Sequence, residues 1–271
     1  MVLSLLEKYN IKGGIFDQHF LVDEGYLDRI VAAAELRSED IVLEIGAGVG
    51  NLTERLAQKA KKVIAIELDP ILVNVLHDKF DDIKRIDIVA GDALKVDFPE
   101  FDKVVSNLPY SISSEITFKL LHHKFKLGIL MYQYEFAARM VSTPNCKDYS
   151  RLTVDTYYFS DASILMTVPK EAFQPVPEVN SAVVKLVPRP TPFRVRDEAF
   201  FMKFVAAVFS QRRKKIRNAI LNTNCILKIP SIRELIAQLP ENLMAKRAEN
   251  LTPEQLAEVA NLIVDLRSKS W

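Results

Sequence analysis

The 271-residue sequence has little cysteine, little glycine and no long apolar run. Its two cysteines, Cys146 and Cys225, stand far apart and outside any Cys-x-x-Cys or Cys/His spacing, which suits a reducing compartment and gives no structural metal site. No apolar run reaches membrane-spanning length, and the opening residues 1–6 are too short for the apolar part of a signal peptide. We therefore expect a cytoplasmic protein that binds no membrane and no metal.

The sequence also lacks a net charge large enough to indicate a nucleic-acid partner. Its 36 basic and 35 acidic residues give a formal charge of +1, so any basic contact surface has to be local. What the sequence does have is a hydrophobic content of 49%, which is ample for one large domain and a small one.

The first informative pattern is a strand followed by a glycine turn and a helix. Residues 40–45 predict a buried strand that leads into the turn Gly46-Ala47-Gly48-Val49-Gly50, and a helix is expected to begin near Leu52. Glycine permits a tight turn and a close approach of the backbone to a ligand, which the helix N-terminus faces with unpaired amides. The third glycine of the dinucleotide fingerprint lies one residue later, so this spacing favours a nucleoside without a pyrophosphate.

Two acidic residues stand where the next two predicted strands end. Glu67 follows the apolar run 62–66, where its carboxylate can accept both ribose hydroxyls of a nucleoside. Asp92 follows the run 86–90, where it can accept a hydrogen bond from an adenine amino group. Each acid alone could be a solvated residue at a strand end. Together with the glycine turn they fall at one edge of a doubly wound sheet, where such folds bind ligands.

The fourth predicted strand, residues 101–106, leads into Asn107-Leu108-Pro109-Tyr110. This segment supplies an amide, an aromatic ring, and backbone carbonyls whose direction Pro109 restrains. Together these groups can bind a flat amino-heterocycle. If the Asn107 side-chain oxygen and the Leu108 or Pro109 carbonyl accept the two amino hydrogens, the lone pair of the amine is held in a fixed direction. The alternative is an ordinary turn at the end of a strand, which Asn and Pro often form.

Further motifs extend along nearly the whole chain. They are residues 18–21 (QHFL), 133–140 (QYEFAARM), 173–181 (FQPVPEVNS), 209–218 (FSQRRKKIRN) and 247–251 (RAENL). With the strand-end residues, they resemble the small-subunit rRNA adenine dimethyltransferases, which are Rossmann-like enzymes that use S-adenosylmethionine. Two departures affect the expected loop conformations, because Asp17 and Ser150 each stand where that family commonly has glycine.

The resemblance implies an α/β fold with a doubly wound, mostly parallel sheet that binds S-adenosylmethionine. The residues that it implies for the cofactor are Gln18, His19, Leu21, Gly46, Gly48, Glu67, Leu68, Asp92, Ala93 and Asn107. The residues that it implies for catalysis are Asn107, Leu108, Pro109, Tyr110 and Phe173. Tyr110 would stack on the extruded base and Phe173 on its opposite face, although Phe173 could instead be a core aromatic residue. We assign Glu44 no direct contact.

A proline-rich linker at residues 188–192 divides the chain into a methyltransferase domain, residues 1–188, and a small all-α domain, residues 189–271. In the second domain, apolar residues repeat at helix spacing and predict a core face: Phe200, Phe201, Phe204, Val205, Val208 and Phe209. A local basic cluster follows, made of Arg212, Arg213, Lys214, Lys215 and Arg217. Such a run can be a solvated helix face, but beside an adenine-methylating pocket RNA phosphate contacts are the better hypothesis.

The leading hypothesis is a monomeric enzyme that dimethylates the exocyclic amine of adenines in small-subunit rRNA, with a pre-ribosomal particle as its partner. One alternative is a related enzyme that acts on large-subunit rRNA or on DNA, although the small C-terminal domain argues against DNA. Another is a non-catalytic ribosome assembly factor that keeps the fold, against which the intact acids and the segment from Asn107 to Tyr110 argue. A small-molecule methyltransferase would need no basic helix.

Overall fold

The computed structural model describes residues 2–11, 13 and 18–269 of the chain. The expectation for the loop at Asp17 lies outside these described residues. Within them, no helix is long and apolar enough to cross a membrane.

The chain divides into two compact units. The first contains Met1–Ala137 and Asp161–Pro188, and the second contains Ala138–Ser160 and Arg189–Trp271. Residues 138–160 therefore belong to the second unit, whereas the sequence placed them in the first domain. The reason is packing: the Tyr149 hydroxyl donates to the Leu251 carbonyl at 2.8 Å, and Val154 and Tyr158 lie in the hydrophobic cluster of the second unit.

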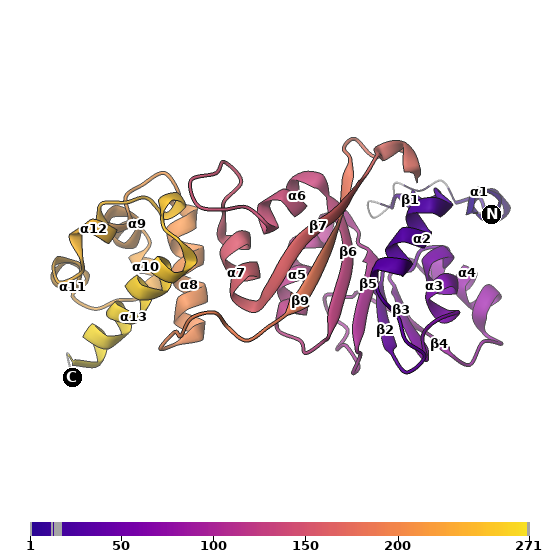
Figure 1. The fold of residues 1–271 in the computed structure, drawn as a ribbon, viewed down its shortest axis with the longest axis horizontal. Helices are drawn as coiled ribbons and strands as arrows, with labels where there is room; N and C mark the ends of the chain where they lie inside the picture. Colours follow the sequence, from indigo (N-terminus) through magenta and orange to yellow (C-terminus); the bar gives the residue numbers. More distant parts are fainter. Residues whose placement is uncertain (1, 12, 14–17, 270–271) are drawn as a thin grey trace. The chain divides into compact units, whose positions relative to one another are not determined.

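The first unit is built on a seven-stranded sheet with the strand order β4-β3-β2-β5-β6-β9-β7 (Figure 1). Its strands are β2 (Ile41–Ile45), β3 (Lys62–Glu67), β4 (Ile86–Ala90), β5 (Lys103–Asn107), β6 (Leu127–Gln133), β7 (Ser160–Val168) and β9 (Ser181–Pro188). The strands from β4 to β6 in this order pair in parallel, and β9 pairs antiparallel with β6. The expected mostly parallel α/β sheet is confirmed.

The order of the strands reverses beside β2. The chain proceeds from β2 outward to β3 and β4 and then places β5 on the other side of β2. Doubly wound sheets bind their ligands at the carboxyl ends of the strands next to such a switch point. Gly46 follows the last residue of β2, and Glu67 and Asn107 are the last residues of β3 and β5. One edge of the sheet therefore collects all three.

The first unit also contains helices. They are α1 (Val2–Lys8), α2 (Glu24–Ala33), α3 (Asn51–Ala57), α4 (Pro70–Phe80), α5 (Ser113–Leu121) and α6 (Tyr134–Met140), the last of which continues into the second unit. Helix α2 begins after Asp23, whose carboxylate accepts a hydrogen bond from the Tyr26 amide at 3.1 Å and so caps the helix N-terminus. Its buried Leu27 joins Leu56 of α3 and Val63 of β3 in one hydrophobic cluster, which anchors the glycine turn between β2 and α3.

The second unit is helical. Its elements are the rest of α6, α7 (Arg151–Phe159), α8 (Glu198–Ser210), α9 (Ile216–Asn222), α10 (Asn224–Leu227), α11 (Ile232–Ala237), α12 (Glu241–Met244), η4 (Ala248–Asn250) and α13 (Pro253–Lys269). The apolar face predicted on α8 lies in the core, where Phe201, Phe204 and Val208 are fully buried. These aromatic rings are therefore unavailable for stacking on bases.

Candidate active site

The glycine turn after β2 needs glycine at three positions. Gly46, Gly48 and Gly50 have φ angles of 74°, 59° and 77°, which side chains rarely adopt. A Cβ atom on Gly50 would lie 2.4 Å from the Phe80 ring, and one on Gly48 would lie 3.2 Å from the Phe20 ring. Gly46 and Gly48 line the cavity beside the turn, where the absence of a side chain leaves the backbone open to a ligand.

Glu67 at the end of β3 is held in place by three backbone amides. Its Oε2 accepts from the Gly48 amide at 2.8 Å, and its Oε1 accepts from the Leu68 and Asp69 amides at 2.8 and 3.0 Å. Burial raises the pKa of the carboxyl, and these hydrogen bonds oppose the rise. A carboxylate has about four acceptor sites. Three of these sites are in use, and the contact of Glu67 with the two ribose hydroxyls stays a prediction.

Asp92 lies in the turn after β4, and a residue that the sequence reasoning missed fixes that turn. The Leu94 amide donates to Asp92 Oδ1 at 2.9 Å. Lys119 of α5 donates its ammonium hydrogens to the carbonyls of Ala93, Leu94 and Val96, at 2.9, 3.4 and 2.5 Å. An ammonium has three hydrogens, so this lysine ties the turn to the helix that follows Tyr110. A single lysine in a helix carries no sequence signal for such a role.

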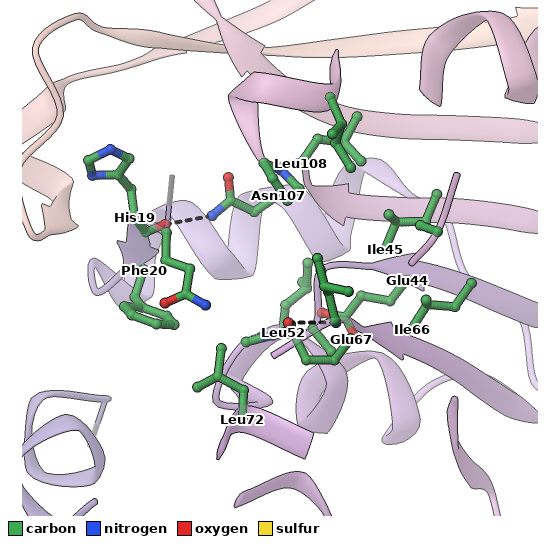
Figure 2. Close-up of a pocket in the computed structure, with 18 of the residues that line it drawn as sticks. His19, Phe20, Glu44, Ile45, Leu52, Ile66, Glu67, Leu72, Asn107 and Leu108 are labelled. Carbon is green, nitrogen blue, oxygen red and sulfur yellow. Dashed lines mark hydrogen bonds between the residues drawn. The ribbon is translucent and has the colours of Figure 1, made fainter. Parts of the chain in front are cut away.

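Asn107 at the end of β5 points its amide toward His19 (Figure 2). Its Nδ2 donates to the His19 backbone carbonyl at 3.1 Å, so the amide nitrogen is engaged and Oδ1 is the atom of this side chain that could accept a further hydrogen bond. The Pro109 carbonyl already accepts from the Ile112 amide at 3.3 Å, in the 3₁₀ turn η2 (Tyr110–Ile112). This favours the Leu108 carbonyl as the second acceptor.

The Tyr110 ring is fixed at both its edge and its face. Its hydroxyl shares a hydrogen bond of 2.6 Å with the Ser181 hydroxyl at the start of β9. Its ring stacks beside His19, with centroids 5.8 Å apart and an angle of 24° between the planes. The His19 Nδ1 atom in turn lies 2.8 Å from the Pro175 carbonyl oxygen. Tyr110 is therefore held in a defined orientation before any base arrives.

Phe173 is buried in the core and is not positioned to stack on a base. It belongs to the short strand β8 (Phe173–Gln174), where it pairs with Leu21 of β1 (Phe20–Leu21). Its side chain is 1% exposed and packs in the core with Val105 and Met131. The expectation that Phe173 stacks on the base is corrected here, because the strand pairing turns its ring into the core.

One cavity of about 240 Å³ collects the remaining predicted residues. Its lining includes every residue expected to contact the cofactor: Gln18, His19, Leu21, Gly46, Gly48, Glu67, Leu68, Asp92, Ala93 and Asn107. It also includes Leu108, Pro109 and Tyr110. The contacts themselves stay predictions, but the residues meet in one place.

The cavity is acidic. Three carboxyl groups line it, those of Glu44, Glu67 and Asp92, and the described lining residues include no lysine or arginine. Glu44 is 1% exposed, and burial raises its pKa to about 8. Such a cavity suits a cationic ligand. The sequence reasoning gave Glu44 no contact, because its position inside a strand does not show which face of the sheet it occupies.

The basic cluster of the second unit divides into two groups. Arg212 forms an ion pair with Glu249 at 2.9 Å, and Arg217 forms one with Glu241. The other three, which are Arg213, Lys214 and Lys215, are exposed. A β-bridge pairs Lys215 with Arg247, which is also exposed together with Lys246. We call Arg213, Lys214, Lys215, Lys246 and Arg247 the exposed basic surface; the last two were not predicted, and Arg247 also forms an ion pair with Glu249 at 3.6 Å.

The family model for ribosomal RNA adenine dimethylase matches residues 12–265 of the chain. A protein of Methanosarcina barkeri named probable ribosomal RNA small subunit methyltransferase A is 80% identical over 268 residues, which cover 99% of this chain and 93% of that protein. A dimethyladenosine transferase from Plasmodium falciparum has a similar crystal structure, with a TM-score of 0.76, 32% identity, and coverage of 93% of this chain and 98% of that one. The 23S rRNA methyltransferase ErmE follows with a TM-score of 0.67, 29% identity, and coverage of 90% and 99%.

Proposed function

Because the chain belongs to the ribosomal RNA adenine dimethylase family, we propose that it transfers methyl groups from S-adenosylmethionine to adenine amines in small-subunit rRNA and forms dimethyladenosine. The proposal rests on Asn107, which presents an amide oxygen beside a fixed aromatic ring at the edge of the acidic cavity. The name of the similar Methanosarcina barkeri protein supports the small subunit as the source of the RNA.

The residues that line the cavity offer the groups that would hold S-adenosylmethionine. The close backbone at Gly46 and Gly48 leaves room for the methionine portion, Glu67 offers an acceptor to the ribose, and Asp92 offers one to the adenine amine. The unpartnered Oε2 atom of Glu44 is a buried polar atom that a cation can compensate. When bound, the cofactor supplies an electrophilic methyl group, and the residues of this chain position the acceptor for it.

The acceptor amine is a poor nucleophile, because its lone pair is delocalised into the adenine ring. We propose that Asn107 Oδ1 and the Leu108 carbonyl accept its two hydrogens, and that Tyr110 stacks on the base. A side-chain amide is not a base at neutral pH, so Asn107 orients the amine rather than removing its proton. A monomethylated amine has one hydrogen left, and the second transfer therefore proceeds with one of the two acceptors unused.

The exposed basic surface, from Arg213 to Arg247, is proposed to contact RNA phosphates. We further propose that the protein acts as a cytoplasmic monomer on a pre-ribosomal particle. The structural similarity to ErmE keeps large-subunit rRNA as the second candidate substrate.

The test is to incubate the protein with labelled S-adenosylmethionine and either undermethylated small subunits, undermethylated large subunits or free rRNA. Label on the small subunit, with the modified nucleotides located by primer-extension arrest, would support the proposal. Label on large-subunit rRNA alone would support the second candidate. Binding of small subunits without label on any RNA would instead support a non-catalytic assembly factor.

A further inference from the structure

Glu44 is a buried acid in the wall of the cavity. It is the next-to-last residue of β2, pairs with Ala65 of β3, and lies on the same side of the cavity as Glu67 (Figure 2). Its side chain is 1% exposed, and within the part of the chain that the structure describes no group donates a hydrogen bond to its Oε2 atom. A buried carboxylate with an oxygen that accepts no hydrogen bond is strongly unfavourable, so such a group stays protonated until something compensates its charge.

The charged groups around Glu44 do not provide that compensation. Glu67 on β3 disfavours its ionisation, and Lys79 on α4 favours it more weakly. The Lys79 ammonium is turned toward other acceptors, since it donates to the Val49 carbonyl at 3.0 Å and lies 3.8 Å from the Glu54 carboxylate. The Thr53 hydroxyl on α3 opposes the rise in the Glu44 pKa more than Lys79 does, but it carries no charge and does not outweigh burial. Burial therefore dominates and raises the pKa of Glu44 to about 8.

We propose that Glu44 is a cofactor-binding residue that holds a proton in the free protein and releases it when S-adenosylmethionine enters the cavity. The carboxyl O–H bond breaks, the proton leaves to solvent, and the carboxylate stays behind as the counter-charge of the bound cation. The cofactor carries two cationic groups, a sulfonium and an ammonium, and either can act on Glu44. This inference rests on the proposed function, because it takes S-adenosylmethionine as the ligand.

Coupling between a proton and a ligand has a measurable signature. A ligand that favours the ionised form lowers the pKa of Glu44, so binding releases protons at any pH below the pKa of the free protein. With a pKa of about 8, binding at pH 7 should release about 0.9 proton per site. Below the pKa, the affinity for the cofactor should rise with pH by up to about tenfold per unit.

The experiment is isothermal titration calorimetry of the full chain at pH 7, in two buffers that differ in ionisation enthalpy. The ligands are S-adenosylmethionine and S-adenosylhomocysteine, which keeps the ammonium but lacks the positive sulfur. The variants are Glu44→Gln and, as a control, Glu100→Gln, which removes an exposed carboxylate from the loop before β5.

The expected result is release of about 0.9 proton on S-adenosylmethionine binding in the wild type and in Glu100→Gln, and almost none in Glu44→Gln. Smaller release with S-adenosylhomocysteine would assign the effect to the sulfonium, and equal release would assign it to the ammonium. Binding with equal proton release in the wild type and in Glu44→Gln, or with none in the wild type, would overturn the inference. Absence of any cofactor binding would instead contradict the proposed function.

Infrared difference spectra of the wild-type protein test the same loss of the Glu44 proton without a variant. Addition of S-adenosylmethionine should remove one protonated carboxyl band. An unchanged protonated carboxyl band on binding would also overturn the inference.

Discussion

Replacing Glu44 by glutamine should stabilise the free protein in a way that depends on pH. The pKa of this carboxyl is raised from its ordinary 4.5 to about 8 in the fold. Between those values the unfolded chain has lost its proton and the folded chain keeps it, so the unfolded state binds fewer protons and stability falls as pH rises. Below pH 4.5 both states are protonated and the penalty vanishes.

The size of the effect follows from the same two pKa values. Each unit of pKa difference is worth about 1.4 kcal/mol. The wild type should therefore lose about 4 kcal/mol relative to Glu44→Gln between pH 5 and pH 9, and little more above that range. Glutamine keeps the shape of the side chain and has no charge to bury, so the variant escapes this loss.

The assay has to report on the first unit alone, because two compact units need not unfold together. Urea unfolding followed by pulsed hydrogen exchange and mass spectrometry of peptides from β2 and β3 meets this need. Glu100→Gln is the control and should follow the wild type at every pH. A difference between Glu44→Gln and the wild type that stays constant from pH 5 to pH 9 would refute the reasoning.

Three further predictions concern cofactor, base and RNA. Lys119→Met keeps the apolar stem but loses the three hydrogen bonds to the turn at Asp92, so the KM for S-adenosylmethionine should rise about tenfold with kcat nearly unchanged in steady-state assays. Tyr110→Leu should lower kcat/KM for RNA roughly tenfold or more while cofactor binding measured by calorimetry is kept, and Tyr110→Phe should lose less, because it keeps the aromatic ring and removes the hydroxyl that bonds to Ser181. The double variant Lys214→Ala/Lys215→Ala should reduce the slope of log RNA affinity against log salt by about 2 in filter-binding titrations.

Much of the first unit could be predicted because its signals are local. An apolar run, a glycine turn and an acid at a strand end are each read from a few neighbouring residues. The parallel order of the sheet then brings Gly46, Glu67 and Asn107 to one edge. The core face of α8 was predictable for the same reason, since its apolar residues repeat within a single helix.

The features that could not be predicted from the sequence depend on contacts between residues that lie far apart in the chain. Phe173 is buried because β8 pairs with β1, two short strands with no propensity signal. The sequence does not distinguish Arg212 from its basic neighbours, because the difference is its ion pair with Glu249, which lies far away in the sequence. Lys119 becomes informative only when the turn after β4 lies beside α5. Such contacts follow from tertiary packing, which periodicity and motif spacing do not encode.

We propose that Asn107 orients the adenine amine for methyl transfer. The most direct test of this role is the amount of dimethyladenosine formed on undermethylated small subunits. Nucleosides should be measured by mass spectrometry for the wild type, Asn107→Ala and Asn107→Asp. Asn107→Asp keeps an acceptor oxygen but loses the Nδ2 donor that binds the His19 carbonyl. We predict dimethyladenosine with the wild type, none with Asn107→Ala although cofactor still binds, and strongly reduced product with Asn107→Asp. Dimethyladenosine at the wild-type level with Asn107→Ala would contradict the account.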